Sequence, residues 1–234
     1  METLIKTLKK NIAKLNNKHD LSDDFLDKLY SVFPFNKFEY VISHLIAEKI
    51  ITLEQYLEIR NEYCSRNKFL HLFNMTTNFG EWSQNHLNEL VQELQKPSKL
   101  LDKEYDGEYD FWYDNIKIEV KSSRAVEYKN NKPMQEKALG TNSKLRFDMN
   151  FQQIKPKCAD VFVFIAVWRD KIKYWVLPSS DINNNKYYSP GQHRGNIDEG
   201  QLHFNEKNIK EFDNYLVSPR NLLEEIKKKG EVKL

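Results

Sequence analysis

The chain has little cysteine, little glycine and no long apolar run, and each shortage excludes a class of protein. Its two cysteines, Cys64 and Cys158, lie far apart and form no CxxC pattern, which argues against a disulfide framework or a zinc knuckle and favours a reducing, cytoplasmic location. Seven glycines form no glycine-rich phosphate loop, and no GxSxG nucleophile elbow occurs. The longest apolar run, Val161 to Trp168, is too short to span a bilayer, so no membrane association is expected.

Neither the histidine spacing nor the net charge indicates a function, but charge is unevenly distributed along the sequence. The six histidines show no HxH or HExxH spacing, so a zinc hydrolase is not indicated, and a net charge of +2 does not by itself indicate a nucleic-acid partner. Residues 81–119 hold ten acidic against four basic residues, whereas residues 121–157 hold nine basic against three acidic. An acidic segment beside a basic one suits a protein that holds metal cations against a polyanion, although charged runs usually form solvated surfaces.

The most informative segment is YDFWYDNIKIEVK, residues 109–121, which predicts a β-hairpin. An aromatic strand, Tyr109 to Tyr113, is followed by Asp114 and Asn115 as a two-residue turn. The alternating stretch Ile116 to Lys121 then forms the second strand.

Side chains alternate between the two faces of a strand, and this places the hairpin's charged residues together. Glu119 and Lys121 share one face, while Ile118 and Val120 point into a core, and Asp110 lies across from the Glu/Lys pair on the neighbouring strand. Two carboxylates and one ammonium group on rigid strands suit a hard divalent cation and a phosphate.

Glu-x-Lys alone has little value, because 30% of the residues are charged and the triplet occurs four times. Only the triplet at Glu119 lies in a β-patterned run with an acidic residue on the strand before it. The competing interpretation is an edge hairpin with a solvated Glu/Lys face, and such surface pairs contribute little to stability.

Elements on both sides of the hairpin extend the pattern. The segment from Glu81 to Leu94 has the apolar spacing of an amphipathic helix. Downstream, we expect a short helix over Phe151 to Ile154, a strand buried on both faces over residues 160–168, and an alternating strand over Ile172 to Leu177. This order, with one poorly defined strand near residues 104–108, predicts a mixed α/β (α+β) fold.

Asp110 followed by Glu-x-Lys on an aliphatic strand resembles the PD-(D/E)xK nuclease superfamily, which includes most type II restriction endonucleases; Tyr109 stands here in place of the proline. The resemblance implies an αβββαβ core and double-stranded DNA as substrate. It also implies a homodimer and Mg²⁺ as cofactor, for which Mn²⁺ substitutes.

The resemblance also implies roles for individual residues. Asp110, Glu119 and the Val120 carbonyl would bind the metal, and Lys121 would contact the attacked phosphate. Glu81, on the preceding helix, matches the additional acidic residue at the metal site of many members, although an acidic residue in a first helical turn is favoured by the helix dipole alone. The identity of the general base stays open.

Two other functions remain open beside a restriction endonuclease. A repair or structure-specific nuclease would keep the same fold and metal site. A nucleic-acid-binding protein without catalysis would use the Glu/Lys pair only as a surface pair.

We expect two regions. Residues 1–75 read as helical, with helices begun by residues 22–24 and by Thr52, and would serve in dimerisation, as a DNA clamp or as cover for the core. Residues 76–234 would form the nuclease core with polar loops that contact DNA. The DNA-binding candidates are Arg124, Asn142, Lys144, Arg146, Gln152, His193 and Arg194.

Overall fold

The computed structural model describes residues 6–7, 10, 13–14, 35–191 and 198–231, so the helix expected after residues 22–24 lies outside the described residues. The chain divides into two compact units, Met1–Glu62 and Tyr63–Leu234, with a boundary earlier than the expected one near residue 75. None of the helices in these ranges is long and apolar enough to cross a membrane.

The described part of the first unit is helical, as the sequence predicts. It contains η1 (Phe35–Lys37), α3 (Glu39–Ala47) and most of α4 (Leu53–Arg66), which runs across the boundary. Thr52 begins α4 through a reciprocal capping box: its Oγ1 accepts from the Gln55 backbone N–H at 3.1 Å, and its own N–H donates to the Gln55 side chain at 2.8 Å. No residue of α3 is buried.

The second unit holds a five-stranded mixed sheet with the strand order β1-β2-β5-β6-β9. Its strands are β1 (Phe111–Tyr113), β2 (Ile116–Arg124), β5 (Val161–Val167), β6 (Ile172–Pro178) and β9 (Leu216–Val217). Strands β2 and β5 are parallel, and the other pairs are antiparallel. The expected mixed α/β class is therefore confirmed.

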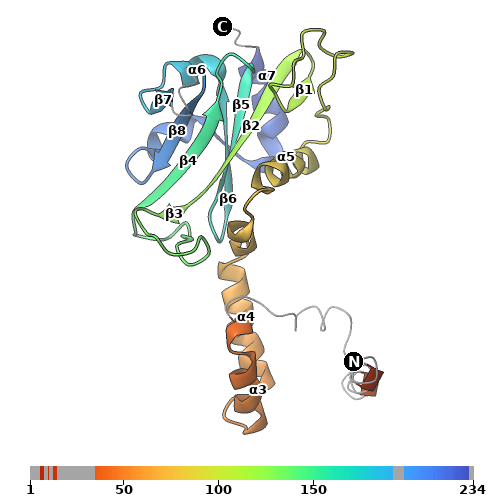
Figure 1. The fold of residues 1–234 in the computed structure, drawn as a ribbon, viewed down its shortest axis with the longest axis vertical. Coiled ribbons are helices and arrows are strands. Elements are labelled where there is room, and N and C mark those ends of the chain that lie inside the picture. The colour runs from red at the N-terminus through yellow and green to blue at the C-terminus, as the bar shows by residue number, and fades with distance from the viewer. Residues whose placement is uncertain (1–5, 8–9, 11–12, 15–34, 192–197, 232–234) are drawn as a thin grey trace. The chain divides into compact units, whose positions relative to one another are not determined.

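A second, antiparallel sheet has the order β3-β4-β8-β7 (Figure 1). Its strands are β3 (Val126–Glu127), β4 (Phe147–Ile154), β8 (Gly200–Asn205) and β7 (Tyr188–Pro190). The remaining elements are η2 (Leu70–Asn74), α5 (Phe79–Leu90), α6 (Ser179–Asn183), η3 (Ile209–Tyr215), η4 (Pro219–Asn221) and α7 (Leu222–Gly230).

Three expectations about these elements are wrong. Phe151 to Ile154 is the end of strand β4 and not a helix, and residues 104–108 are irregular and form no strand. Polar and apolar residues alternate from Asp148 to Gln152, which is the period of a half-buried strand. The strand expected over Ile172 to Leu177 is present as β6, but its burial does not alternate, because its last five residues are all buried.

The two sheets share one aromatic core. Phe151 of β4 contacts Phe164 of β5 and Phe204 of β8, with ring centroids 5.0 and 5.1 Å apart in edge-to-face geometry. Every residue of β5 is buried, as its unbroken apolar run predicts. Helices α5 and α7 pack against the first sheet, so β2 is held between helices and the second sheet's strand β4.

Candidate active site

The predicted hairpin forms, with a first strand that begins at Phe111 and not at Tyr109, and its turn explains its register. Asp114 and Asn115 have φ angles of 45° and 64°, the left-handed pair that a type I′ turn requires and that matches the twist of the strands. Phe111 pairs with Ile118, and the Asp110 N–H donates to the Ile118 carbonyl at 3.0 Å. Asp110 therefore lies beside Glu119, as the sequence predicts.

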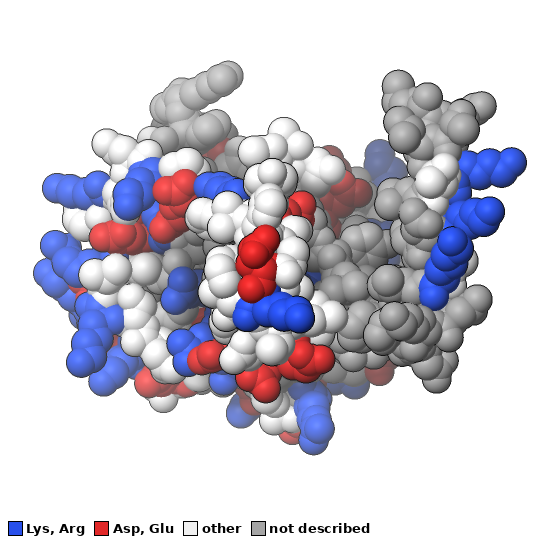
Figure 2. All heavy atoms as spheres, turned by 90° about the horizontal axis from the view of Figure 1, so that it is seen from below, with Lys and Arg blue, Asp and Glu red and all other residues white. Residues whose placement is uncertain are grey.

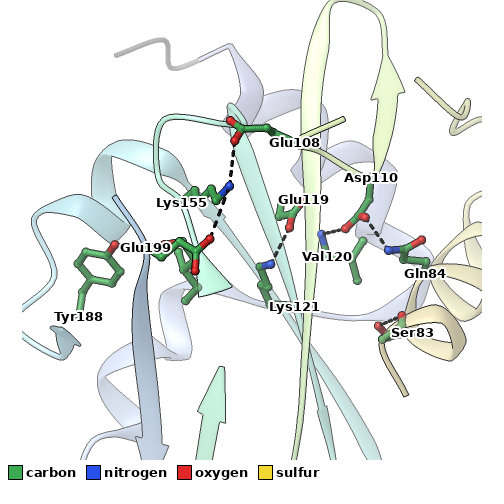
Figure 3. Close-up of polar contacts among 12 residues, drawn as sticks. Ser83, Gln84, Glu108, Asp110, Glu119, Val120, Lys121, Lys155, Tyr188 and Glu199 are labelled. Atoms are coloured by element: carbon green, nitrogen blue, oxygen red, sulfur yellow. Dashed lines mark hydrogen bonds and ion pairs between the residues drawn. The ribbon is translucent and has the colours of Figure 1, made fainter. Parts of the chain in front are cut away.

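Asp110 is held by two donors (Figure 3). Its Oδ2 accepts from the Val120 backbone N–H at 2.8 Å, and its Oδ1 accepts from the Gln84 amide Nε2 at 2.5 Å. The other end of the Gln84 amide, Oε1, accepts from Lys96 Nζ at 3.1 Å. Strand and helix thus fix the orientation of this carboxylate before any ligand binds.

Glu119 and Lys121 form a close ion pair, with Lys121 Nζ 2.6 Å from Glu119 Oε1 (Figure 3). The side chains are only 10% and 16% exposed, which rules out the solvated-face interpretation of this Glu-x-Lys triplet. Placing charges out of water is unfavourable unless they are fully paired, so this pair is not an ordinary surface pair.

Burial raises the pKa of both carboxylates, and the positive charge nearby does not fully oppose it. It raises the pKa of Asp110, against the Val120 N–H and the Lys121 ammonium, which act to lower it. Burial raises the pKa of Glu119 to about 7, helped by the neighbouring Asp110 and opposed by Lys121. Two carboxylates that resist ionisation in one small region are typical of functional sites, and a cation would stabilise their charged forms.

The site lies in a cavity of about 640 Å³. Asp110, Glu119, Lys121 and Gln84 line one side of it. Strand β1 pairs with β2 only over residues 116–118, so the charged residues lie where the described β1 no longer covers the edge of β2. The other side of the cavity belongs to β4 and is lined by Asp148, Asn150, Gln152 and Gln153.

The donor set fits a magnesium ion. Among the described residues no cluster of three or more His, Cys, Asp or Glu side chains is placed to hold a metal. Mg²⁺ does not need such a cluster, because it usually binds through one or two carboxylates and keeps water and phosphate oxygens as its other ligands. Asp110 and Glu119 supply the two carboxylates, and Val120 lines the same cavity.

Glu81 does not join this site. Burial in α5 follows Phe79, Ser83 and Leu87, and Glu81 lies about 200° around the helix from Phe79, so it lines a separate depression with Trp82. The residue that α5 does bring to Asp110 is Gln84, which the sequence argument missed. Its signal was the four-residue spacing from Gly80, which also lines the cavity.

The predicted DNA-binding residues fall into different environments. Arg124 lines the cavity, but its Nη1 donates to the carbonyls of Leu72 and Met75 at 3.0 and 2.7 Å, and its guanidinium stacks on Phe79 at 4.1 Å. It therefore anchors the chain that leads into α5. Gln152 is exposed and lines the cavity.

The other candidates lie away from the cavity walls or outside the described residues. Asn142 and Lys144 are exposed on the loop before β4. Arg146 pairs with Glu206 at 3.1 Å and lies over the Tyr128 ring. His193 and Arg194 fall in the range 192–197, outside the described residues.

Basic side chains gather beside the second sheet. Figure 2, seen from below Figure 1, shows Lys and Arg along its left edge, the side on which Figure 1 places β3. Exposed basic residues of the β3–β4 connection are Lys129, Lys132, Lys144 and Arg146. A basic rim near an acidic pocket agrees with the charge division along the sequence.

The neighbouring thiol of Cys158 is not part of the candidate site. Burial, with Glu119 adding to it, raises the pKa of Cys158 to about 12, so this thiol stays protonated at neutral pH. It lines a second cavity together with Glu108 and Lys155, which form an ion pair at 2.8 Å.

Comparison with known proteins adds no assignment. No protein-family model matches the chain, and no curated protein sequence matches it.

Proposed function

We propose that the chain is a Mg²⁺-dependent endonuclease that hydrolyses phosphodiester bonds of double-stranded DNA at a specific short site, similar to type II restriction endonucleases. The observation that carries the proposal is the meeting of Asp110, Glu119 and Lys121 in one cavity, with burial raising the pKa of both carboxylates. Two carboxylates with raised pKa values beside an ammonium group suit the binding of a divalent cation and a phosphate better than a purely structural role.

Each residue has a separate task in this proposal. Asp110, Glu119 and the Val120 carbonyl would hold Mg²⁺, which when bound lowers the pKa of water and stabilises negative charge on the phosphate. The Val120 N–H and Gln84 keep Asp110 oriented. Lys121 pairs with Glu119 at 2.6 Å, and with a cation bound to that carboxylate its ammonium would be free to contact the phosphate.

The fold supports the superfamily resemblance in part. Helix α5 precedes the hairpin, and the site strand β2 runs parallel to the buried strand β5. The connection between β2 and β5, residues 125–160, contains β3 and β4 and no helix, which departs from the αβββαβ order. The site geometry therefore carries the proposal more than the order of elements does.

A two-fold dimer would present one proposed site to each strand of a palindromic duplex. We therefore include a homodimer in the proposal, since a two-fold axis in the protein matches a palindromic site.

Digestion of supercoiled plasmid DNA tests the function. Wild-type protein with Mg²⁺ is expected to give discrete, reproducible fragments that disappear in EDTA. Asp110→Asn and Lys121→Ala should abolish cutting, whereas Asp213→Asn and Lys210→Ala, exposed residues on η3, should not. Cutting by both site variants at near wild-type rates would refute the assignment, and smears or branch-dependent cuts would indicate a repair or structure-specific nuclease.

A further inference from the structure

Strand β4 contains an irregularity at the wall opposite the charged residues. Met149 and Phe151 point into the core, as regular alternation requires. The pairing register with β8 then shifts between Phe151 and Ile154, and Gln153 adopts a φ of 56°. A side chain other than glycine rarely occupies this region, so the irregularity is a β-bulge held by its surroundings.

The bulge changes where two neighbouring side chains lie. In a regular strand, consecutive residues project to opposite faces. Gln152 and Gln153 instead are both exposed and both line the cavity that contains Asp110 and Glu119. Bulges next to active sites commonly redirect a side chain, and strain of this kind tends to persist where function requires it.

The rest of this wall carries hydrogen-bonding groups and no positive charge. Residues 147–154 contain no lysine or arginine. Asn150 Nδ2 donates to Gln201 on β8 at 2.7 Å, and Asp148 Oδ1 lies 3.0 Å from His203 Nδ1. Such a wall has no positive charge to attract phosphates, and its amides are suited to the edges of bases.

We propose that Gln152 and Gln153 determine sequence specificity by reading an adenine edge of duplex DNA while Asp110, Glu119 and Lys121 face the scissile phosphate. A glutamine amide can bond both to N6 and to N7 of adenine in the major groove. The inference rests on the proposed endonuclease function and assigns its base-reading element. Phosphate contacts then fall to the basic side chains of the β3–β4 connection, such as Lys144.

Digestion of a randomised duplex library with Mg²⁺, followed by sequencing of cut and uncut molecules, tests the inference. The key variant is Gln152→Ala combined with Gln153→Gly, because Gln152 is exposed and glycine accepts the positive φ at position 153. Gln92→Ala, an exposed glutamine outside the cavity, is the matched control.

Wild type and the control should prefer adenine at one or more positions. The double variant should lose that preference by about 5- to 150-fold in relative cutting rates, the fold-change for one good bidentate base contact. Lys144→Ala should slow all sequences alike, because a phosphate contact carries no base preference. Replacing the preferred adenine by 7-deazaadenine, which lacks N7, should slow the wild type and leave the double variant unaffected.

The outcomes separate the two proposals. An unchanged preference in the double variant, or a wild type that cuts without base preference, overturns the base-reading role and leaves the endonuclease in place. A wild type that does not cut with Mg²⁺ overturns the endonuclease itself, and with it the inference.

Discussion

The two walls of the cavity belong to two different sheets and have opposite chemistry. On the first sheet, β2 and Asp110, which directly precedes β1, present a buried and a half-buried carboxylate and an ammonium group, and the pKa of Glu119 rises to about 7. On the second sheet, β4 presents the amides of Asn150, Gln152 and Gln153 and the Asp148 carboxylate, which contacts His203 of β8. One aromatic core therefore supports two unlike walls. The first, the charged wall, suits a cation and a phosphate, and the second, the hydrogen-bonding wall, suits the edges of bases.

Removing the core contact between the sheets should destabilise both sheets together and have the largest effect on the free energy of unfolding. Phe151 is fully buried between Phe164 and Phe204. We expect Phe151→Ala to lower the free energy of unfolding by about 3–5 kcal/mol, measured by urea denaturation. Phe38→Ala, at a residue 54% exposed in the first unit, should change it by less than about 0.5 kcal/mol. A urea transition in which only one of the two sheets unfolds would show that the two sheets unfold separately.

Removing the Glu119 charge should slow cutting strongly and raise the stability of the metal-free protein at high pH. We expect Glu119→Gln to slow Mg²⁺-dependent cutting by about 100- to 1000-fold, because an electrostatic contact to the reacting group is lost. In EDTA at pH 8 the same variant should melt at a higher temperature than the wild type, since the buried Glu119 charge is unfavourable there. Glu93→Gln, at an exposed residue, serves as the control. A variant that cuts normally would remove Glu119 from the site.

The charged wall should also give the metal-free protein a distinctive pH dependence. The pKa of Glu119 is about 7 in the folded state against an ordinary value of 4.5, so the folded protein binds more protons between these values and its stability falls as pH rises through them. His86, whose pKa burial lowers, acts in the opposite direction. The measurement is therefore the difference in unfolding free energy between wild type and Glu119→Gln from pH 4.5 to 8.

Under the proposed function magnesium should offset this loss, because it would bind the ionised carboxylates. We expect Mg²⁺ to raise the melting temperature of the wild type more at pH 8 than at pH 5.5, and to leave Glu119→Gln nearly unchanged. At a hundredfold excess over its dissociation constant, a ligand stabilises by about 2.7 kcal/mol. An equal shift at both pH values would mean that the ion binds elsewhere.

The smallest expected effect concerns Gln84, which supports the charged wall from α5. Gln84→Ala removes one donor to Asp110 and should slow cutting by about tenfold, consistent with the loss of one hydrogen bond to a charged group. Gln84→Glu should lower the melting temperature in EDTA by repulsion and increase the stabilisation by Mg²⁺. Gln92→Ala and Gln92→Glu are matched controls. Unaltered Mg²⁺ stabilisation in Gln84→Glu would place this side chain outside the metal site.

The sequence predicted the charged wall well and the other wall poorly. The hairpin was readable because its turn residues, alternation and aromatic content all agree locally. Phe151 to Ile154 taken alone shows no strand period, so this segment predicts a helix. The alternation that marks strand β4 lies mainly in the residues before it. The bulge at Gln153 added a departure from period two that no simple pattern reveals.

Glu81 illustrates a different limit. The sequence correctly placed an amphipathic helix before the hairpin, but the helix's rotation about its axis was set by which residues the sheet buries. That rotation directs Gln84, and not Glu81, to Asp110. A helix offers several polar faces, and only packing selects among them.

The sequence by itself determined the described helices of the first unit, the hairpin, the buried strand β5 and the mixed α/β class, because periodicity and turn chemistry act over a few residues. Only the tertiary structure decided that Glu119 and Lys121 are buried and not a solvated pair, that Gln84 holds Asp110, and that β4 forms the opposite wall. These depend on desolvation and on contacts between distant segments, which no local pattern encodes.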